Sequence, residues 1–327
     1  MGHATRIGRL GMLAAGLSIG AALAAAPGIA SADSLIGLSP TELSDLDQLL
    51  RLLFDPTGAD MQISINGMDL FPGNSATATS GEGSIAVAIG DGAYANANGG
   101  LFGSELGSLD LAFADGAGSS ANTSLGDVLD VATATDGGSA NVGLDASFDD
   151  ATAIGTGSFA QVGVGASSDT AFADDGGFAD AGVGNNDLAS AFGAGSSATA
   201  GVGNENFATA VNGGDATAGG YLANAFANGT GTDAVAGGVS TTATVSGTNA
   251  LAQAEGLGDL ASVINTGSAF DSAIAAGPFD TAEIFGTGST AVAGSDFFLD
   301  LAAVFGNMLD ANATGGNFLI DILPSLF

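Results

Sequence analysis

The chain contains no cysteine and no tryptophan, and it has a single histidine and only three basic residues among 327. The histidine and two of the basic residues lie within the first nine positions, so neither histidine nor a basic residue occurs beyond Arg51. Those side chains supply most general bases, nucleophiles and zinc ligands in enzymes. Only carboxylates remain for acid–base catalysis, and we predict that the chain is not an enzyme. The lack of cysteine excludes disulfides.

Positive charge is scarce, whereas the chain carries 35 acidic residues and a formal net charge of −32 at pH 7. A surface of this sign repels phosphate backbones, which argues against nucleic acid as a partner. Only 12% of the residues are charged and the mean hydropathy is +0.40, unlike the composition of a disordered chain. The sequence therefore predicts a folded acidic protein whose partners are neutral, cationic or bridged by metal.

The first 32 residues have the organisation of a secretory signal peptide. Arg6 and Arg9 precede an apolar stretch from Met12 to Ala26, and Ala30-Ser31-Ala32 provides a small-residue cleavage site. No later segment has the run of about 20 apolar residues that a transmembrane helix needs. We expect a protein that is secreted or held at the cell surface or cell wall, without a transmembrane span.

Two short elements are predicted before the repeats. Within 33–58, Ser39-Pro40-Thr41-Glu42 is a helix-start pattern, and the following leucines lie on one helical face, which predicts an amphipathic cap helix. Within 59–74, Asn66-Gly67 separates the strand-like runs Met61–Ile65 and Met68–Phe71. This arrangement predicts a β-hairpin that leads into the next segment.

From 75 to 294 the Gly/Ala-rich chain repeats itself every 18 to 21 residues, and each unit has two alanine-alternating runs joined by glycine turns. Such a period is typical of a stacked solenoid. We predict an all-β fold, a narrow β-solenoid (β-roll or β-helix) of about eleven coils with short helical caps at both ends. The repeat is clearest in five successive segments, which begin at Gly137, Gly157, Gly176, Gly195 and Gly213.

Side-chain alternation sorts the residues of each run onto two faces. In the second run of each unit one face is uniformly small and apolar, which places alanine inside and predicts a flattened coil. In the first run the other face carries large apolar residues. We expect these to turn inward at the corners; if they point outward instead, they form an interaction stripe made of Phe113, Phe172, Phe192, Phe207 and Phe226.

The last segment, 295–327, changes in character again and is predicted to be an apolar cap or an envelope-attachment segment. Within it Phe297 to Leu309 fits a helix with Phe298, Ala302, Phe305 and Leu309 on one side.

Two further patterns suggest ligands. The stretch Gly229-Thr-Gly-Thr-Asp233-Ala-Val235 resembles the calcium-binding nonapeptide of repeat-in-toxin proteins, and the resemblance implies calcium as a possible ligand, with Asp187, Asp215 and Asp233 as candidate metal ligands. The alternative is that these acids are solvated charges that keep the array soluble. Outward rows of Thr133, Thr152, Thr199, Thr209 and Thr217 resemble the flat faces of ice-binding solenoids.

The runs SIAVAIGDGAYANANGG from Ser84 and SFDDATAIGTGSFA from Ser147 resemble the head repeats of trimeric autotransporter adhesins and haemagglutinins, which build a β-roll. The whole chain, with its ISINGMDLF hairpin, resembles exported Gly/Ala-rich repeat proteins of mycobacteria. The resemblance implies a structural or adhesive protein that meets envelope components or surface molecules of a host or neighbour. The alternatives are a calcium-dependent exported solenoid, a carboxylate-based enzyme acting on polysaccharides, and an ice-binding solenoid; the oligomeric state stays open.

Overall fold

The computed structural model describes residues 60–71, 74–81, 83–97, 110–124, 129–144, 147–165, 167–229, 232–247, 249–264, 271–286, 288–294, 300–307, 309–314 and 320–324. All of them belong to the compact unit Ala59–Phe327. The predicted signal peptide and the predicted helix within 33–58 lie outside the described residues. Every regular element in the described ranges is a β-strand, as the all-β prediction required.

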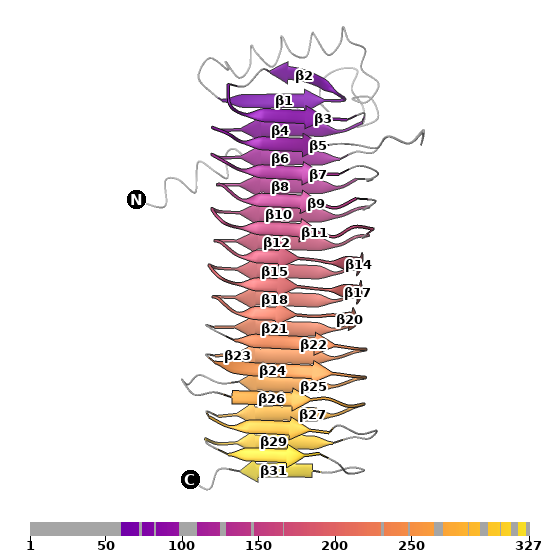
Figure 1. Cartoon of the computed structure of the whole chain (residues 1–327), viewed down its shortest axis with the longest axis vertical. Helices are drawn as coiled ribbons and strands as arrows, with labels where there is room; N and C mark the ends of the chain where they lie inside the picture. Colours follow the sequence, from indigo (N-terminus) through magenta and orange to yellow (C-terminus); the bar gives the residue numbers. More distant parts are fainter. Residues whose placement is uncertain are drawn as a thin grey trace, which may run out of the picture. The chain divides into compact units, whose positions relative to one another are not determined.

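The strands form two long sheets, sheet A and sheet B, and a short third sheet (Figure 1). Sheet A has 15 strands in the order β2 (Met68–Phe71), β1 (Met61–Ile65), β4 (Ile85–Ile89), β6 (Leu111–Asp115), β8 (Val131–Thr135), β10 (Asp150–Ile154), β12 (Thr170–Asp174), β15 (Leu188–Phe192), β18 (Phe207–Val211), β21 (Asn224–Asn228), β23 (Thr242–Ser246), β25 (Leu260–Ile264), β27 (Thr281–Phe285), β29 (Leu301–Phe305) and β31 (Ile320–Pro324). Sheet B has 13 strands in the order β3 (Thr77–Ser80), β5 (Tyr94–Ala97), β7 (Ser120–Thr123), β9 (Ser139–Val142), β11 (Phe159–Val162), β13 (Phe178–Asp180), β16 (Ser197–Thr199), β19 (Asp215–Thr217), β22 (Asp233–Gly237), β24 (Ala250–Glu255), β26 (Asp271–Ala275), β28 (Thr290–Ala293) and β30 (Asp310–Ala313). The third sheet contains β14 (Val183–Asn185), β17 (Val202–Asn204) and β20 (Gly220–Tyr221).

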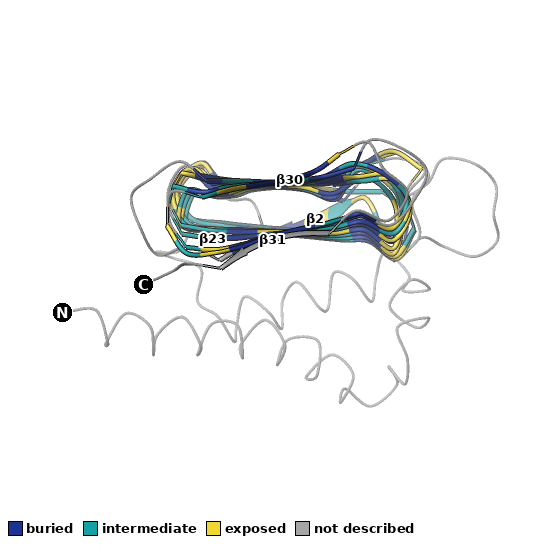
Figure 2. Ribbon diagram, turned by 90° about the horizontal axis from the view of Figure 1, so that it is seen from below, coloured by how far each residue is buried: buried dark blue, intermediate teal, exposed yellow. Residues whose placement is uncertain are grey.

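The chain alternates between the two long sheets, so each coil contributes one strand to sheet A and one to sheet B. From β4 onward neighbouring strands of sheet A are parallel and pair alanine with alanine, as in Ala151↔Ala132 and Ala151↔Ala171. Seen along the stack, the two sheets lie as flat layers facing each other (Figure 2). The predicted solenoid is confirmed, and eleven strands of sheet A, β4 to β27, fall within 75–294.

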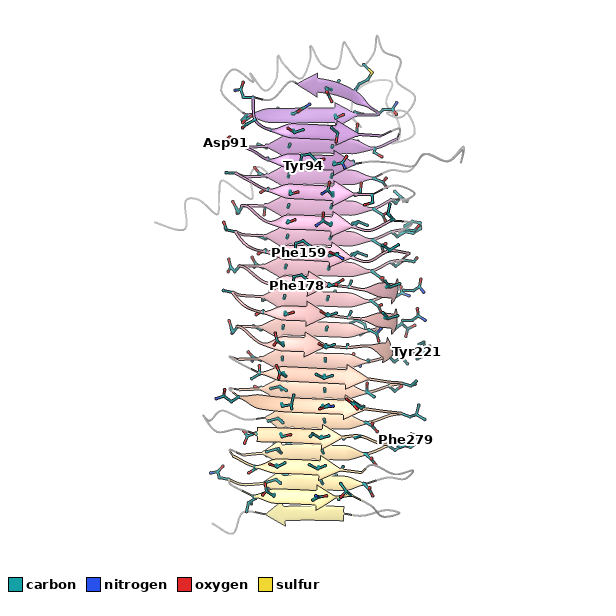
Figure 3. The ribbon with its side chains drawn as sticks, in the orientation of Figure 1. Asp91, Tyr94, Phe159, Phe178, Tyr221 and Phe279 are labelled. Atoms are coloured by element: carbon teal, nitrogen blue, oxygen red, sulfur yellow. The ribbon has the colours of Figure 1, made fainter. Side chains whose placement is uncertain are left out.

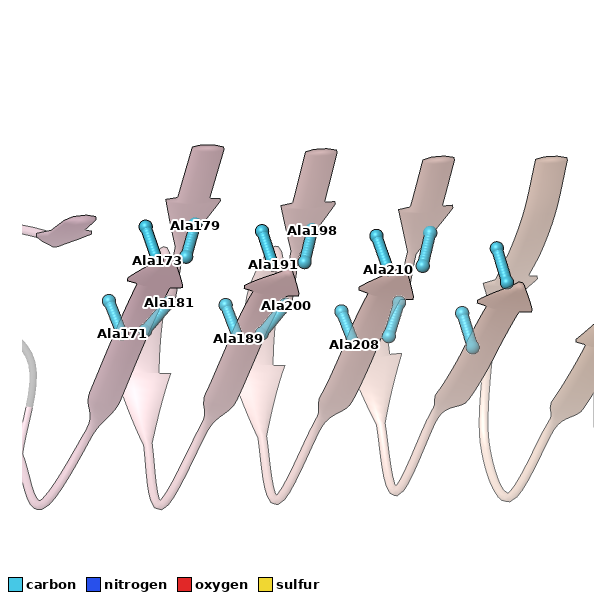
Figure 4. Close-up of a cluster of buried hydrophobic side chains, with 14 of the residues drawn as sticks. Ala171, Ala173, Ala179, Ala181, Ala189, Ala191, Ala198, Ala200, Ala208 and Ala210 are labelled. Atoms are coloured by element: carbon cyan, nitrogen blue, oxygen red, sulfur yellow. The ribbon is translucent and has the colours of Figure 1, made fainter. Parts of the chain in front are cut away.

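The core is the alanine-lined space between the two sheets. Ala189 and Ala191 of sheet A and Ala198 and Ala200 of sheet B are all 0% exposed, and neighbouring coils repeat the arrangement (Figure 4). Methyl groups fill most of the inward positions, because the sheets approach closely and protein interiors are close-packed. The inward alanine face and the narrow coil are therefore confirmed. A few inward positions carry larger side chains: Val142, Val162, Val245, Val263, Ile284 and Val304.

Between β6 and β24 the turns from sheet A to sheet B alternate between four and three residues. Gly155 to Ser158 is a four-residue turn with φ of 93° at Gly155 and 83° at Gly157. In the next coil Asp175 to Gly177 takes three residues, with φ of 50° at Asp175. Position 177 accepts only glycine, because the Cβ of any other residue would lie 2.5 Å from the carbonyl oxygen of Ala191. The glycine turns of the sequence thus serve both reversal and close approach of the backbone.

The predicted hairpin is confirmed at the start of sheet A. β1 and β2 pair antiparallel, and Asn66 and Gly67 have φ of 52° and 76°. Two positive φ angles are typical of the type I′ turn that Asn-Gly favours. β1 then pairs antiparallel with β4, so that the hairpin begins the sheet as expected.

The predicted C-terminal helix is wrong in its described part. Leu301–Phe305 form strand β29, which pairs parallel with β27, and the stack continues to β31. The inward positions of the strand differ from the predicted helical face, since Ala302 and Val304 are 0% exposed, whereas Phe305, predicted on the same helical face as Ala302, is 44% exposed. A parallel partner strand was available at the end of the stack, and pairing with it satisfies the backbone hydrogen bonds.

Candidate functional site

The outer face of sheet B is polar. Its two rows consist mostly of Ser, Thr, Asn, Gln and Asp, and amides in neighbouring coils bond to each other, as in the 3.1 Å hydrogen bond from Asn122 Nδ2 to Asn141 Oδ1. The aromatic exceptions are Tyr94 on β5 and the pair Phe159 and Phe178, whose rings stack with centroids 5.3 Å apart (Figure 3). This face therefore offers mainly hydrogen-bonding groups.

The outer face of sheet A is apolar over much of its length, which corrects the expectation that its large side chains turn inward. Leu111, Phe192, Phe207 and Phe226 are 36%, 37%, 45% and 40% exposed. The physical reason is the alanine core: each strand alternates strictly, and its inward positions face other alanines across a space too narrow for a phenylalanine ring. The outward alternative of the sequence analysis is the one observed.

The structure brings four of the five predicted stripe residues together. Phe172, Phe192, Phe207 and Phe226 lie on consecutive strands β12, β15, β18 and β21, and the rings of Phe172 and Phe192 lie 5.2 Å apart. Phe113 lies on β6, with β8 and β10 between it and β12. Together with their apolar neighbours the four form a cluster, here named the apolar patch: Phe172, Leu188, Phe192, Phe207, Val211 and Phe226.

The apolar patch is free of charge at its centre. Strands β15 and β18 present only Leu188, Ser190, Phe192, Phe207, Thr209 and Val211 on this face. Asp174 borders it as the register partner of Phe192. Contiguous exposed apolar groups rimmed by polar residues are typical of interaction sites.

A second feature, which the sequence analysis missed, is a column of buried acids at the turn from sheet B into sheet A. It is here named the aspartate column, and its carboxyl members in the described residues are Asp110, Asp130, Asp149, Asp169, Asp187, Asp259, Asp280 and Asp300. Each is at most 1% exposed. The acids are scattered in the sequence, yet each stands immediately before a sheet A strand of the form x-Ala-x-Ala, x-Ala-x-Val or, after Asp280, x-Ala-x-Ile. This D-x-A-x-A/V/I pattern was the available signal.

Hydrogen bonds link the aspartate column from coil to coil. Oδ1 of Asp149 accepts a 2.7 Å hydrogen bond from the backbone N–H of Asp169, and Oδ1 of Asp169 accepts one of 2.7 Å from Asp187. Oδ1 of Asp187 in turn accepts a 2.8 Å bond from the N–H of Asn206, which replaces aspartate at this position. The carboxyl groups thus hold successive coils in register.

The environment of the column favours the protonated acids. Burial raises the pKa of Asp130 and Asp169 to about 7, although backbone N–H groups that bond the carboxylates oppose it and the neighbouring aspartates add to it. Burial likewise raises the pKa of Asp187 and Asp259 to about 6. Burial therefore brings the pKa values of these four carboxyls close to neutrality.

The three predicted calcium ligands do not share one place. Asp187 belongs to the aspartate column, at the turn where sheet B leads into sheet A. Asp215 and Asp233 are direct register partners on the outer face of sheet B, next to the opposite turns. Burial, and then the charge of Asp233, raise the pKa of the Asp215 carboxyl. Within the described ranges no group of three or more acidic or histidine side chains is arranged to hold a metal ion.

The predicted threonine rows are short. Thr133 and Thr152 are neighbours on sheet A, but Phe172 follows them in the same row. On sheet B, Thr199 and Thr217 are neighbours, and Val235 follows. A regular threonine face across many coils is not formed at these five positions.

Comparison of the chain with protein-family models, curated proteins and solved structures finds no match. In the described part of the chain, no helix has the length and apolar character required to cross a membrane. The apolar patch and the aspartate column are thus the two features from which a role can be argued.

Proposed function

We propose that this chain is an exported, non-catalytic repeat protein of the cell envelope, with a structural and adhesive role, and that it binds its partner through the apolar patch. The single observation that carries the proposal is the difference between the two outer faces of the solenoid. Sheet A exposes aromatic and aliphatic side chains over consecutive coils, whereas sheet B exposes mainly hydroxyls and amides.

The patch favours a partner that is itself apolar and carries no dense negative charge. Phe192 and Phe207 present about two-fifths of their surface to solvent, and burying such rings is the usual source of affinity at a protein interface. The acidic surroundings, with a net charge of −32 for the chain, repel anionic partners. Envelope components or surface molecules with neutral apolar surface match both properties.

The repeat architecture supports a display role. In a solenoid each coil contacts only its neighbours, so that outer side chains change without loss of the alanine core. The patch therefore sits on a rigid support built from parallel strands. Export follows from the predicted signal peptide, and cell fractionation of a tagged chain tests it: the proposal requires the protein in the wall or the medium, and a cytoplasmic location would contradict it.

The binding face is tested with two double variants of the full chain. Phe192→Ser with Phe207→Ser removes aromatic rings from sheet A, and the matched control Phe159→Ser with Phe178→Ser removes the stacked pair from sheet B. We expect binding to isolated envelope fractions, measured by sedimentation, to weaken at least about tenfold for the sheet A variant only. Equal losses for both variants, or none, would reject the patch as the binding face.

A further inference from the structure

Within the described part of the chain, no basic side chain is available to the aspartate column. The described residues contain no Lys, Arg or His, and Arg51 is the last basic residue of the chain. Buried carboxylates in folded proteins are normally paired with a cation or held by several donors. In this solenoid only protons or solution cations can balance the charge of the column.

In Asp130 and Asp169 the two carboxyl oxygens have different surroundings. Oδ1 of Asp169 accepts the backbone N–H of Asp187, whereas Oδ2 of Asp169 is buried without a hydrogen-bond partner in the described part of the chain. Oδ2 of Asp130 is in the same state. An ionised carboxylate only accepts hydrogen bonds, so a buried oxygen without a donor disfavours ionisation.

The column also stacks like charges. Five consecutive coils carry Asp110, Asp130, Asp149, Asp169 and Asp187, and the backbone N–H of each later aspartate donates to the carboxyl Oδ1 of the one before it. Adjacent strands are about 4.8 Å apart. Carboxylates at such a distance cannot all ionise without mutual repulsion, which is strong where water is excluded.

Asn206 shows that a neutral group fits the column. Its backbone N–H donates to Asp187 Oδ1 at 2.8 Å, and its own Oδ1 accepts the N–H of Ala223 at 3.2 Å. The amide therefore reproduces the coil-to-coil bonding of aspartate without a charge. A protonated carboxyl has the same shape and the same neutral charge.

We propose that the aspartate column is a proton-operated stabilising device: the carboxyls of Asp130 and Asp169 are neutral in mildly acidic surroundings, where the coils stack most firmly, and their ionisation above neutrality weakens the stack. The described part of the chain contains no basic side chain whose charge could offset that of an ionised column carboxylate. Asp169 is faced by Asp149 and Asp187 from the adjacent coils, and Asp130 by Asp110 and Asp149. The remaining described acids and phenols around the column lie on outer surfaces: Asp150, Asp180, Glu205 and Tyr221.

The sign of the effect follows from proton binding. The folded chain holds protons on Asp130 and Asp169 up to about pH 7, whereas an unfolded chain releases them near about pH 4. Between these values the folded state binds more protons, so the free energy of unfolding falls as pH rises and recovers on acidification. Most proteins show the opposite trend in this range, because their carboxylates are paired.

The test uses the full chain and two variants. Asp130→Asn with Asp169→Asn copies the neutral state that Asn206 already provides. The matched control is Asp175→Asn, which changes an exposed acid in a three-residue turn. Asn212 occupies the equivalent position of a later three-residue turn, so asparagine is compatible with this conformation. Melting temperatures are measured by circular dichroism between about pH 4 and about pH 8 at constant ionic strength, with and without EDTA.

For the unaltered chain and the control we expect the melting temperature to fall by at least about 5 °C from acid to alkaline pH. The double variant should lose part of that fall and melt higher than the unaltered chain at the alkaline end. A flat or rising curve for the unaltered chain, or a variant curve lowered equally at every pH, would overturn the proposal. A melting temperature that drops on chelation would also overturn it, since a bound cation would then balance the column.

Infrared spectroscopy of the unaltered chain gives a second reading that does not depend on the variants folding. We expect a protonated-carboxyl band that persists at pH 6 to 7, well above the ordinary aspartate range of about 4. Disappearance of the band below about pH 5 would show that the column is ionised at neutrality and would reject the proposal.

Discussion

The side-chain hydroxyl of Ser158 accepts a 2.9 Å hydrogen bond from the backbone N–H of Gly176 in the next coil. The same hydroxyl donates to the carbonyl oxygen of Ile154 within its own turn. Ser119 repeats the bond to Gly137, two coils earlier. In both places the serine that ends a four-residue turn satisfies a backbone donor of the three-residue turn that follows, so that the two turns work as a pair.

Replacing Ser158 with alanine should therefore destabilise the solenoid. The change leaves the N–H of Gly176 without its acceptor, whereas the carbonyl of Ile154 keeps the N–H of Asp175, and an unsatisfied buried group costs about 1–3 kcal/mol. Chemical denaturation measures the loss. The control is Ser197→Ala on the outer face of sheet B, which we expect to stay within about 0.5 kcal/mol of the unaltered chain. A result in which both changes cost the same would show that the turn hydroxyl has no special role.

The alanine core predicts that size, and not only polarity, is limited inside the coil. Ala191 is 0% exposed and lies opposite the alanines of sheet B, so Ala191→Leu has no room and should cost about 1–3 kcal/mol or more. Ser190→Leu, one residue away but outward, adds the same side chain to the apolar face and should be nearly neutral. The two variants are compared by thermal melting. Tolerance of leucine at Ala191 would mean that the sheets can move apart.

The regular part of this fold was predictable because one small residue fills the core. Alanine at every second position, as at Ala140 and Ala160, fixes which side faces in, and the glycines fix where the chain reverses. The Asn66-Gly67 turn was equally clear. The alanine and glycine patterns are local and recur in every unit, so a deviation at one position does not change the predicted fold.

The missed features depend on distances between coils. Whether Phe192 turns inward depends on the gap between the sheets, which alternation alone does not give. Leu301–Phe305 fits both helical and strand spacing, and an available partner strand decides the outcome. The role of Asp169 becomes visible only when the coils are aligned and its bond to Asp187 appears. Pattern analysis within one unit cannot show a contact that exists only between units.

The calcium alternative predicts that removal of the ion unfolds the chain, and the structure favours the opposite result. Asp215 and Asp233 form a pair of carboxylates on an exposed face, whereas calcium takes six to eight oxygen ligands, about 2.3–2.6 Å away. We expect EDTA to leave the β signal in circular dichroism unchanged, and the variant Asp215→Asn with Asp233→Asn to behave identically. Loss of the β signal on chelation, restored by calcium, would contradict this and favour the calcium-dependent solenoid.

Asp60 anchors the start of the stack and should respond to acid in the direction opposite to the aspartate column. Its carboxylate accepts the hydroxyl of Ser75 and the backbone N–H groups of Ala76, Ser75 and Asn74, which lower its pKa to about 2. Because the folded-state pKa is depressed, this anchor is fully present above about pH 4 and is lost as the pH falls towards 2.

The prediction for Asp60→Asn is a local loosening. Amide hydrogen exchange, read by mass spectrometry near pH 5, should become faster in Asn74–Ala76 and in β1 and β2, while the coils from β8 onward keep their protection, because each coil contacts only its neighbours. Asp69→Asn, at an exposed position of β2, is the control and should change nothing. If exchange in β1 and β2 stays unaltered in Asp60→Asn, the hairpin is held by its pairing with β4 alone, and the carboxylate is dispensable.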